Sequence, residues 1–377
     1  MGIVFSFVIK ILLLVQYAYP LLVFLFLFQI FKRSPRRLLY LYVIFVAVIA
    51  ALFKPSEHDD LFRYFEKLEF IRSLGNWDSI VTFFADNTYF EGAPLYFLLQ
   101  YIYSFFPDWF MPFASVMLLY TLVGSLTLRV CKSRNLSSVQ ISFAILCVFY
   151  FINLYSAISS FRYMLTLSIL VNVLYYDFVR KKNIYLCLFL YFFMGYLHTI
   201  AYSILVLRLI CLIPKSRFYF IGCLVLLVSW QQFSGLLADF IGSGSASAIE
   251  LSSRITQYAE YEEPAQVFYE FALYSFLVTL VVWIVYISRR RIHNSKLPFT
   301  DFELFVFFTI AFILGNRSQI NLVFRYTHML MMLFPIVYSE MNVVIPNSRF
   351  TYPRNMLSFC FVIFFVYYVT QQYSLLC

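Results

Sequence analysis

The stretch Ser56-Glu57-His58-Asp59-Asp60-Leu61-Phe62-Arg63-Tyr64-Phe65 gathers charge of both signs between two long apolar runs. If the chain is helical from Asp59 onward, Asp59 lies one turn from Arg63, and Asp60 lies one turn from Tyr64. Carboxylates, a guanidinium and a phenol then project from neighbouring positions. The flanking runs have the composition of membrane segments, so we expect this stretch to form part of a polar site beside a membrane.

Hydrophobic residues make up 62% of the 377 residues and charged residues only 12%, whereas about a quarter of a soluble domain is charged. A run of about 20 apolar residues crosses a hydrocarbon core of roughly 30 Å, and lipid requires every backbone group to be satisfied within the segment. The runs do not alternate as barrel strands do. We therefore predict an all-α polytopic membrane protein that forms a single transmembrane domain over residues 1–377. The seven cysteines include no CxxC pair and indicate neither a metal site nor a disulfide framework.

The distribution of charge predicts the orientation. Six short basic groups hold 18 of the 28 Lys and Arg residues, and two long loops hold 14 of the 19 Asp and Glu residues. By the positive-inside rule the basic groups are cytoplasmic and the two loops lie outside. The net charge of +9 then reflects topology, and we expect no nucleic-acid partner. The basic groups are residues 32–37, 129–134, 180–182, 215–217, 289–296 and 349–354.

About twelve membrane helices follow from this pattern, with both chain ends outside. The outer loops cover about 54–108 and 238–267. We read the short apolar segment Ala93 to Phe106 as a re-entrant or interfacial helix, because a crossing there would place residues 129–134 outside. The N-terminal apolar run has no small-residue cleavage site after it and is expected to stay in the mature protein. The predicted spans are roughly 11–31, 38–53, 109–128, 136–156, 160–178, 184–197, 199–213, 218–237, 268–288, 302–315, 327–341 and 356–373.

Several basic residues lie where a membrane segment tolerates them poorly. Arg162, at the start of a span, either reaches the outer headgroups or points inward as an anion clamp. His198 is either an interfacial polar group or a general base. Arg317 and Arg325, with His328 close by, lie around the outer mouth of the tenth and eleventh spans. They either pair with headgroups and the acidic second loop, or present bidentate donors to a phosphate group.

The carboxylates of the first outer loop have two readings. Glu57, Asp59, Asp60 and Glu91 lie close to membrane entry, where an acidic residue before a helix caps the free amides of its first turn. The alternative is that one of them is a catalytic base. His58 with Asp59 and Asp60 gives only weak metal-ligand spacing, because consecutive residues diverge on a helix. We expect no metal ion and no cofactor.

An ordered set of motifs resembles a known family. It comprises Asp60-x-x-x-Tyr64, Glu91-Gly-Ala-Pro-Leu-Tyr-Phe-Leu-Leu99, Ser159-Ser-Phe-Arg162, Arg180-Lys-Lys182, Gly195-Tyr-Leu-His198-Thr and Asn321-Leu-Val-Phe-Arg325-Tyr326. On a background of many helices, this order resembles the EpsG family of exopolysaccharide polymerases and is similar to Wzy-type O-antigen polymerases. The likeness extends from about residue 40 to residue 340.

The resemblance implies a GT-C-like membrane glycosyltransferase. Such an enzyme joins oligosaccharide repeat units carried on undecaprenyl diphosphate at the outer face of the bacterial inner membrane, by inverting transfer without a metal. Its partners would be the lipid-linked donor and acceptor, membrane lipid and a chain-length-regulating co-polymerase.

Roles for the candidate residues follow from this expectation. Arg162, Arg325 and Arg317 would bind the donor diphosphate and stabilise the charge that develops on it. Asp60 or Asp59 would be the base, with His198 as rival. The remaining candidates for substrate binding are Arg63, Tyr64, Tyr326, His328 and Glu91.

Other functions share part of this pattern. A flippase or other transporter of lipid-linked oligosaccharide would also have a cationic cavity and many helices, but it would more often show charges at mid-membrane depth and internal repeats. We find no repeat in this sequence. An O-antigen ligase or a membrane O-acyltransferase is a further alternative.

Overall fold

The computed structural model describes residues 29–31, 33–55, 57, 59–75, 78–79, 81–82, 93–152, 154–213, 217–229, 276–282, 284–285, 300–317 and 319–344. Every regular element within these ranges is a helix, so the expected helical class is confirmed for them. Two helices there are long and apolar enough to cross a membrane, Phe110–Ser133 and Asn321–Glu340. The chain forms two compact units, Met1–Leu205 with Met332–Ser339 and Val206–Met331 with Glu340–Cys377. We describe each unit by itself.

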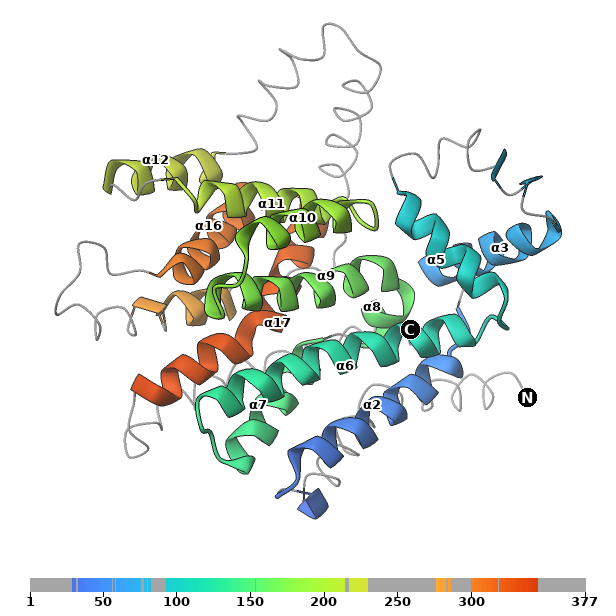
Figure 1. The fold of residues 1–377 in the computed structure, drawn as a ribbon, viewed down its shortest axis with the longest axis horizontal. Coiled ribbons are helices and arrows are strands. Elements are labelled where there is room, and N and C mark those ends of the chain that lie inside the picture. The colour runs from blue at the N-terminus through green and yellow to red at the C-terminus, as the bar shows by residue number, and fades with distance from the viewer. Residues whose placement is uncertain are drawn as a thin grey trace, which may run out of the picture. The chain divides into compact units, whose positions relative to one another are not determined.

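The first unit is built on five long segments, with α6 at their centre. α6 packs against α2, α7, α8 and α9, and Figure 1 shows α2 running alongside it. Gly124 makes the contact with α2 possible, because a Cβ atom there would lie 2.2 Å from Cδ1 of Leu39. The segments are α2 (Pro35–Ala51), α6 (Phe110–Ser133), α7 (Ser138–Phe151), α9 (Phe161–Leu174) continued by the π-helix η2 (Tyr175–Val179), and α10 (Ile184–Gly195).

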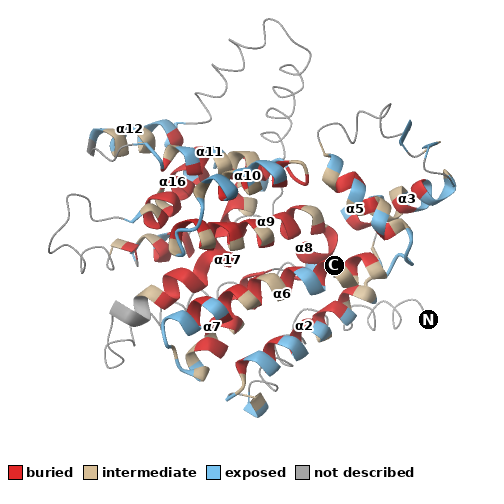
Figure 2. Cartoon of the chain, viewed as in Figure 1, coloured by how far each residue is buried: buried red, intermediate tan, exposed pale blue. Residues whose placement is uncertain are grey.

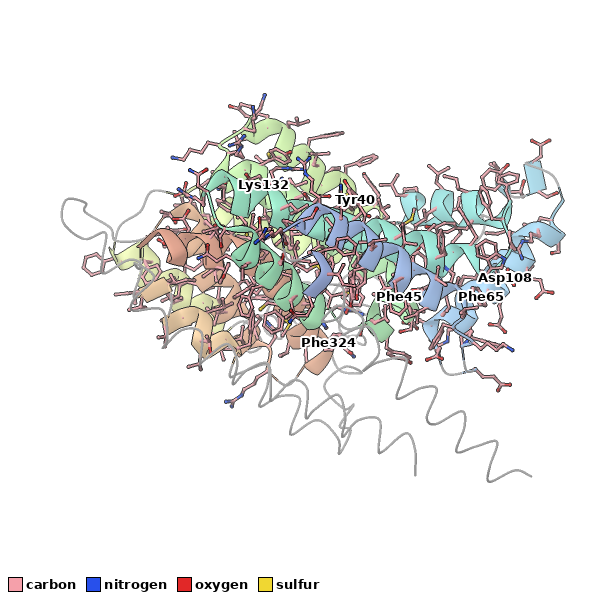
Figure 3. The ribbon with its side chains drawn as sticks, turned by 90° about the horizontal axis from the view of Figure 1, so that it is seen from below. Tyr40, Phe45, Phe65, Asp108, Lys132 and Phe324 are labelled. Atoms are coloured by element: carbon pink, nitrogen blue, oxygen red, sulfur yellow. The ribbon has the colours of Figure 1, made fainter. Side chains whose placement is uncertain are left out.

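Contacts between these helices define two ends of the first unit. Arg129, near the C-terminus of α6, donates a hydrogen bond of 2.5 Å to the hydroxyl of Tyr176 at the C-terminus of α9 and η2. α6 and α9 therefore run in the same direction, and the basic residues that follow them share one end. Lys132 and Asp108 accordingly lie far apart in Figure 3, at the two ends of α6. We call the end that carries residues 129–134 and 180–182 the basic end.

Two shorter helices, α3 (Asp60–Ser73) and α5 (Pro94–Ser104), pack together at the opposite end. The 11 residues of α5 extend about 16 Å, too little to cross a bilayer core of roughly 30 Å. α11 (Ile200–Ile210) has the same number of residues, so this length does not distinguish α5 from the predicted spans, and its assignment as a re-entrant or interfacial helix stays a prediction. Arg72 ties α3 to the turn between α5 and α6, since its guanidinium bonds to the Asp108 carboxylate at 2.7 Å and to the carbonyls of Ser104 and Phe106.

Two capped starts show how local sequence determines the helices. Ser137 and Gln140 form a capping box at the start of α7, and Asn183 accepts hydrogen bonds from the first amides of α10. Such side chains satisfy backbone donors that have no partner within the helix. α7 ends at Phe151 because Ile152 adopts an extended conformation. The short helix α8 (Leu154–Ser159) follows, and Ser160 separates it from α9.

The second unit contains α12 (Arg217–Val228), α16 (Asp301–Gly315) and most of α17 (Ile320–Val344). α12 packs closely on α16, since a Cβ atom on Gly315 would lie 2.1 Å from the carbonyl oxygen of Leu227. Thr300 and Glu303 form a capping box at the start of α16. α11 (Ile200–Ile210) belongs in part to each unit.

Most predicted spans in the described ranges coincide with a helix to within a few residues, but three do not. The span expected over 136–156 is interrupted at Ile152, since α7 ends at Phe151 and α8 follows from Leu154. α6 continues to Ser133 and so includes Arg129 and Lys132, which were expected in a loop. α17 begins at Ile320, whereas the span was expected from residue 327. Hydropathy ends a span at the first charged residue, while Arg and Lys are good helix formers. Most of span 11–31, all of span 356–373 and the second outer loop lie outside the described residues, and a total of twelve spans stays a prediction.

Candidate functional site

Asp59 stands at the N-cap position of α3 but does not cap the helix. Its backbone is extended and its side chain makes no cap hydrogen bond. The carboxylate instead accepts a hydrogen bond from the hydroxyl of Tyr155 on α8, and only 8% of the residue is exposed. The interpretation of Asp59 as a simple helix cap is therefore wrong.

Asp60 begins α3 and is open to solvent. Its carboxylate lies 3.7 Å from the guanidinium of Arg63, with 48% of the Asp60 side chain exposed. The hydroxyl of Ser160, between α8 and α9, donates a long hydrogen bond of 3.4 Å to it. Arg63 thus pairs with Asp60. Asp59, which the sequence spacing also places one turn from Arg63, is not its partner. An exposed pair of this kind is worth about 0–1 kcal/mol, so the carboxylate can take part in other interactions.

Arg162 points into the first unit. It lies in the first turn of α9, and its guanidinium carbon is 4.6 Å from the ring centroid of Tyr96 on α5. Tyr96 is fully buried. This geometry favours the inward reading of Arg162 over the one in which it reaches the outer headgroups, because a cation over an aromatic face gains electrostatic attraction.

Tyr64 packs among aromatic rings. Its ring meets those of Phe161 and Tyr96 edge to face, with centroids 4.8 Å and 5.9 Å away. Tyr103, nearby on α5, contacts Phe161 and shares a hydrogen bond of 2.9 Å with Ser115. Burial raises the pKa of Tyr103, so its hydroxyl keeps its proton. These contacts fix α3, α5 and α9 relative to one another.

Lys67 belongs to the same site, although sequence reasoning did not include it. Its ammonium nitrogen is shielded from solvent and lies 5.7 Å from the ring centroids of both Tyr64 and Tyr96. The available signal was its position one turn after Tyr64 on the same helix face. We call the following residues the α3–α9 cluster: Asp59, Asp60, Arg63, Tyr64, Lys67, Tyr96, Tyr155, Ser160 and Arg162.

His198 lies elsewhere in the first unit, just before α11. Its Nδ1 accepts a hydrogen bond of 3.2 Å from the backbone N–H of Ile200, and the residue is 7% exposed. Because a backbone N–H can only donate, Nδ1 carries no proton, and a neutral ring holds its proton on Nε2. Nδ1 is the ring nitrogen whose lone pair could accept a proton, and a hydrogen bond from the Ile200 amide already engages it. This disfavours His198 as a general base.

The other predicted residues belong to the second unit. Arg317 is exposed in the turn after α16, and Arg325 lies in the second turn of α17 instead of in a loop before it. Tyr326 is 1% exposed and packs on Phe312 with ring centroids 5.0 Å apart. His328 is 2% exposed, with Nδ1 3.0 Å from the Phe324 carbonyl oxygen. Figure 2 shows how much of α17 is buried.

Two residues weighed from the sequence lie outside the described residues, Glu91 and the potential metal ligand His58. Among the described residues, no group of three or more His, Cys, Asp or Glu side chains comes close enough together to hold a metal ion. The α3–α9 cluster therefore offers two carboxylates (Asp59 and Asp60), three cations (Arg63, Lys67 and Arg162) and several phenols. No protein-family model, curated protein or solved structure matches the chain.

Proposed function

We propose that the chain is a polymerase that joins oligosaccharide repeat units carried on undecaprenyl diphosphate, at the outer face of the bacterial inner membrane. The observation that supports this most is the α3–α9 cluster. It combines a solvent-open carboxylate, Asp60, with the inward-pointing guanidinium of Arg162 at the end of the first unit opposite the basic residues. Glycosyl transfer from a lipid diphosphate requires a base for the acceptor hydroxyl and a cation for the leaving group.

In the proposed reaction, Asp60 removes the proton from the acceptor hydroxyl as that oxygen attacks the anomeric carbon of the donor. The bond to the diphosphate breaks on the opposite side, and the configuration inverts without the help of a metal. Arg162 stabilises the negative charge that develops on the leaving diphosphate. Asp59, engaged by Tyr155, holds the start of α3 in position.

Substitution in a deletion strain tests the base. Asp60→Asn should abolish long polymer and leave single capped units, because losing a general base lowers a rate by about 10²–10⁴-fold. Glu66→Gln is the matched control, since Glu66 is an exposed carboxylate on the same helix. The measurement is the ladder of glycan lengths on a gel, at equal protein levels. Polymer of normal length from Asp60→Asn would exclude Asp60 as the base.

The deletion strain itself separates the competing functions. A polymerase defect leaves single repeat units that still reach the outer acceptor. A flippase defect would strand single units on the inner leaflet, and a ligase defect would leave long polymer on its lipid carrier. Either of the last two outcomes contradicts the proposed function.

A further inference from the structure

Tyr176 joins a cation of α6 to the turn between η2 and α10. Its hydroxyl accepts the hydrogen bond of Arg129, whose guanidinium carbon lies 5.3 Å from the centroid of the Tyr176 ring. Its carbonyl oxygen accepts a hydrogen bond of 3.0 Å from the backbone N–H of Lys182. We call residues 180–182 the basic turn. Because Tyr176 fixes Arg129 beside this turn before any ligand arrives, less entropy is lost on binding.

The cations gathered here are open to solvent. All three residues of the basic turn are exposed, as is Arg129. Within the part of the chain that the structure describes, none of these four side chains forms an ion pair. The carboxylate nearest to the turn in sequence, Asp177, is buried in η2 and accepts a hydrogen bond of 3.1 Å from the hydroxyl of Tyr191. The exposed positive charges therefore attract an anion from outside the chain.

Lys181, in the middle of the basic turn, has a backbone conformation that favours glycine. Its φ is 47°, which lies in the left-handed region where a Cβ atom crowds the backbone. Helices commonly end with such a residue, and it is usually glycine or asparagine. Lysine supplies a charge at this position at some cost in stability. Lys181→Gly thus removes the charge and relieves the strain in one step.

An apolar stripe begins directly after the basic turn. α10 starts at Ile184, contains no charged residue, and exposes only hydrophobic side chains of large size. Positions three, four and seven residues apart share one side of a helix, and the rings of Phe189 and Phe193 stack with centroids 5.8 Å apart. A surface of this composition suits hydrocarbon. The α10 stripe comprises Tyr185, Leu186, Phe189, Phe192 and Phe193.

We propose that the basic turn, Arg129 and the α10 stripe together bind an anionic phospholipid. The phosphate of the headgroup pairs with the cations, and the acyl chains lie along the stripe. A soluble phosphate would use the cations alone and a neutral phospholipid the stripe alone, so the two features together select a lipid of net negative charge. The site lies at the basic end, opposite the α3–α9 cluster, and does not depend on the proposed function.

Lipid binding to the purified full chain in detergent tests this proposal, with bound lipid counted by native mass spectrometry. The probes are phosphatidylglycerol, phosphatidylcholine with the same acyl chains, and glycerol 3-phosphate, which has a phosphate but no chains. Phosphatidylglycerol should bind at least about tenfold more tightly than either of the others. Lys181→Gly should weaken it about fivefold and keep or raise the melting temperature. Arg129→Met should weaken it by a similar factor.

Two further variants separate the parts of the site. Phe189→Ser, in the α10 stripe, should weaken both phospholipids by the same factor, because it changes the contact with the acyl chains and leaves the cations in place. Lys54→Met is the matched control for charge, since Lys54 is an exposed lysine after α2. It should leave the binding of phosphatidylglycerol unchanged.

Several results would overturn the proposal. They are equal affinity for the two phospholipids, and wild-type affinity for phosphatidylglycerol in both Lys181→Gly and Arg129→Met. Equally tight binding of glycerol 3-phosphate would assign the cations to a soluble phosphate, and an equal loss in Lys54→Met would show an effect of net charge alone. If Arg129→Met lowers the melting temperature, the proposal is judged on Lys181→Gly, because that change relieves strain.

Discussion

The imidazole of His198 caps the first turn of α11, because its Nδ1 accepts the backbone N–H of Ile200. Asparagine can make the same bond, since its side-chain oxygen accepts from the amide two residues later. We therefore expect His198→Asn to keep both the fold and polymer synthesis. His198→Ala should lower the free energy of unfolding by about 1 kcal/mol, as losses of a helix cap do. Thermal unfolding in detergent and glycan length in a deletion strain measure the two effects.

If His198 is instead the general base, the opposite result is expected. A general base cannot be replaced by asparagine, so abolished polymer in a well-folded His198→Asn variant would reinstate His198 and weaken the case for Asp60. Tyr163→Phe is a suitable control, because the Tyr163 ring contacts His198 at a centroid distance of 6.2 Å and phenylalanine keeps that ring.

The sequence predicts the candidate residues of the α3–α9 cluster better than it predicts their contacts. Asp59 and Asp60 are neighbours with the same charge, yet one is buried against Tyr155, 96 residues away, and the other is open to solvent. No local rule separates them, because their environments come from helices distant in the chain. Lys67 was missed for the same reason, since its significance depends on Tyr96 in another helix.

At the scale of the helices, two glycines should respond in opposite ways to the same substitution. Gly124 on α6 faces Leu39, and a Cβ atom there would overlap that side chain, whereas a Cβ atom on Gly222 of α12 meets nothing within 4 Å. Gly124→Ala should therefore cost about 1–3 kcal/mol through overpacking. Gly222→Ala should be neutral, or stabilising by up to about 1 kcal/mol, because alanine is the better helix former. Chemical unfolding of each variant measures the difference, and equal effects would contradict the α2–α6 contact.

Sequence patterns located the helices well and their ends less well. Ser137, Asn183 and Thr300 are caps of the usual residue types, and each stands at the start of a helix near a predicted boundary. The errors at α6 and α17 arise because hydropathy measures fit to lipid, whereas backbone hydrogen bonding continues through charged residues. Arg325 lies within a turn of α17, so its side chain has fewer orientations available than it would have in a loop.

At the scale of the whole molecule, the first unit separates its charges along the length of α6. The 24 residues of this helix extend about 36 Å, slightly more than a bilayer core of roughly 30 Å. Arg129 and Lys132 are near its C-terminus, while the turn before its N-terminus holds Asp108, bonded to Arg72 of α3. Figure 3 shows Phe65 and Asp108 together at one end and Lys132 at the other. We therefore predict that α6 crosses the membrane and that the α3–α9 cluster lies on the side opposite the basic end.

Cysteine labelling tests this orientation. All seven native cysteines are first replaced, and the variant is kept only if it still complements a deletion strain. Single cysteines are then introduced at Glu69 on α3 and at Lys132 on α6, both exposed positions. A membrane-impermeant maleimide applied to intact spheroplasts should modify Glu69→Cys and leave Lys132→Cys unmodified until the membrane is opened with detergent.

Equal labelling before detergent would contradict the separation of the two ends, because a reagent that cannot cross the bilayer reaches both only if they share one side. Labelling of Lys132→Cys alone would reverse the orientation and place the α3–α9 cluster in the cytoplasm, where a polymerase acting on exported units has no substrate.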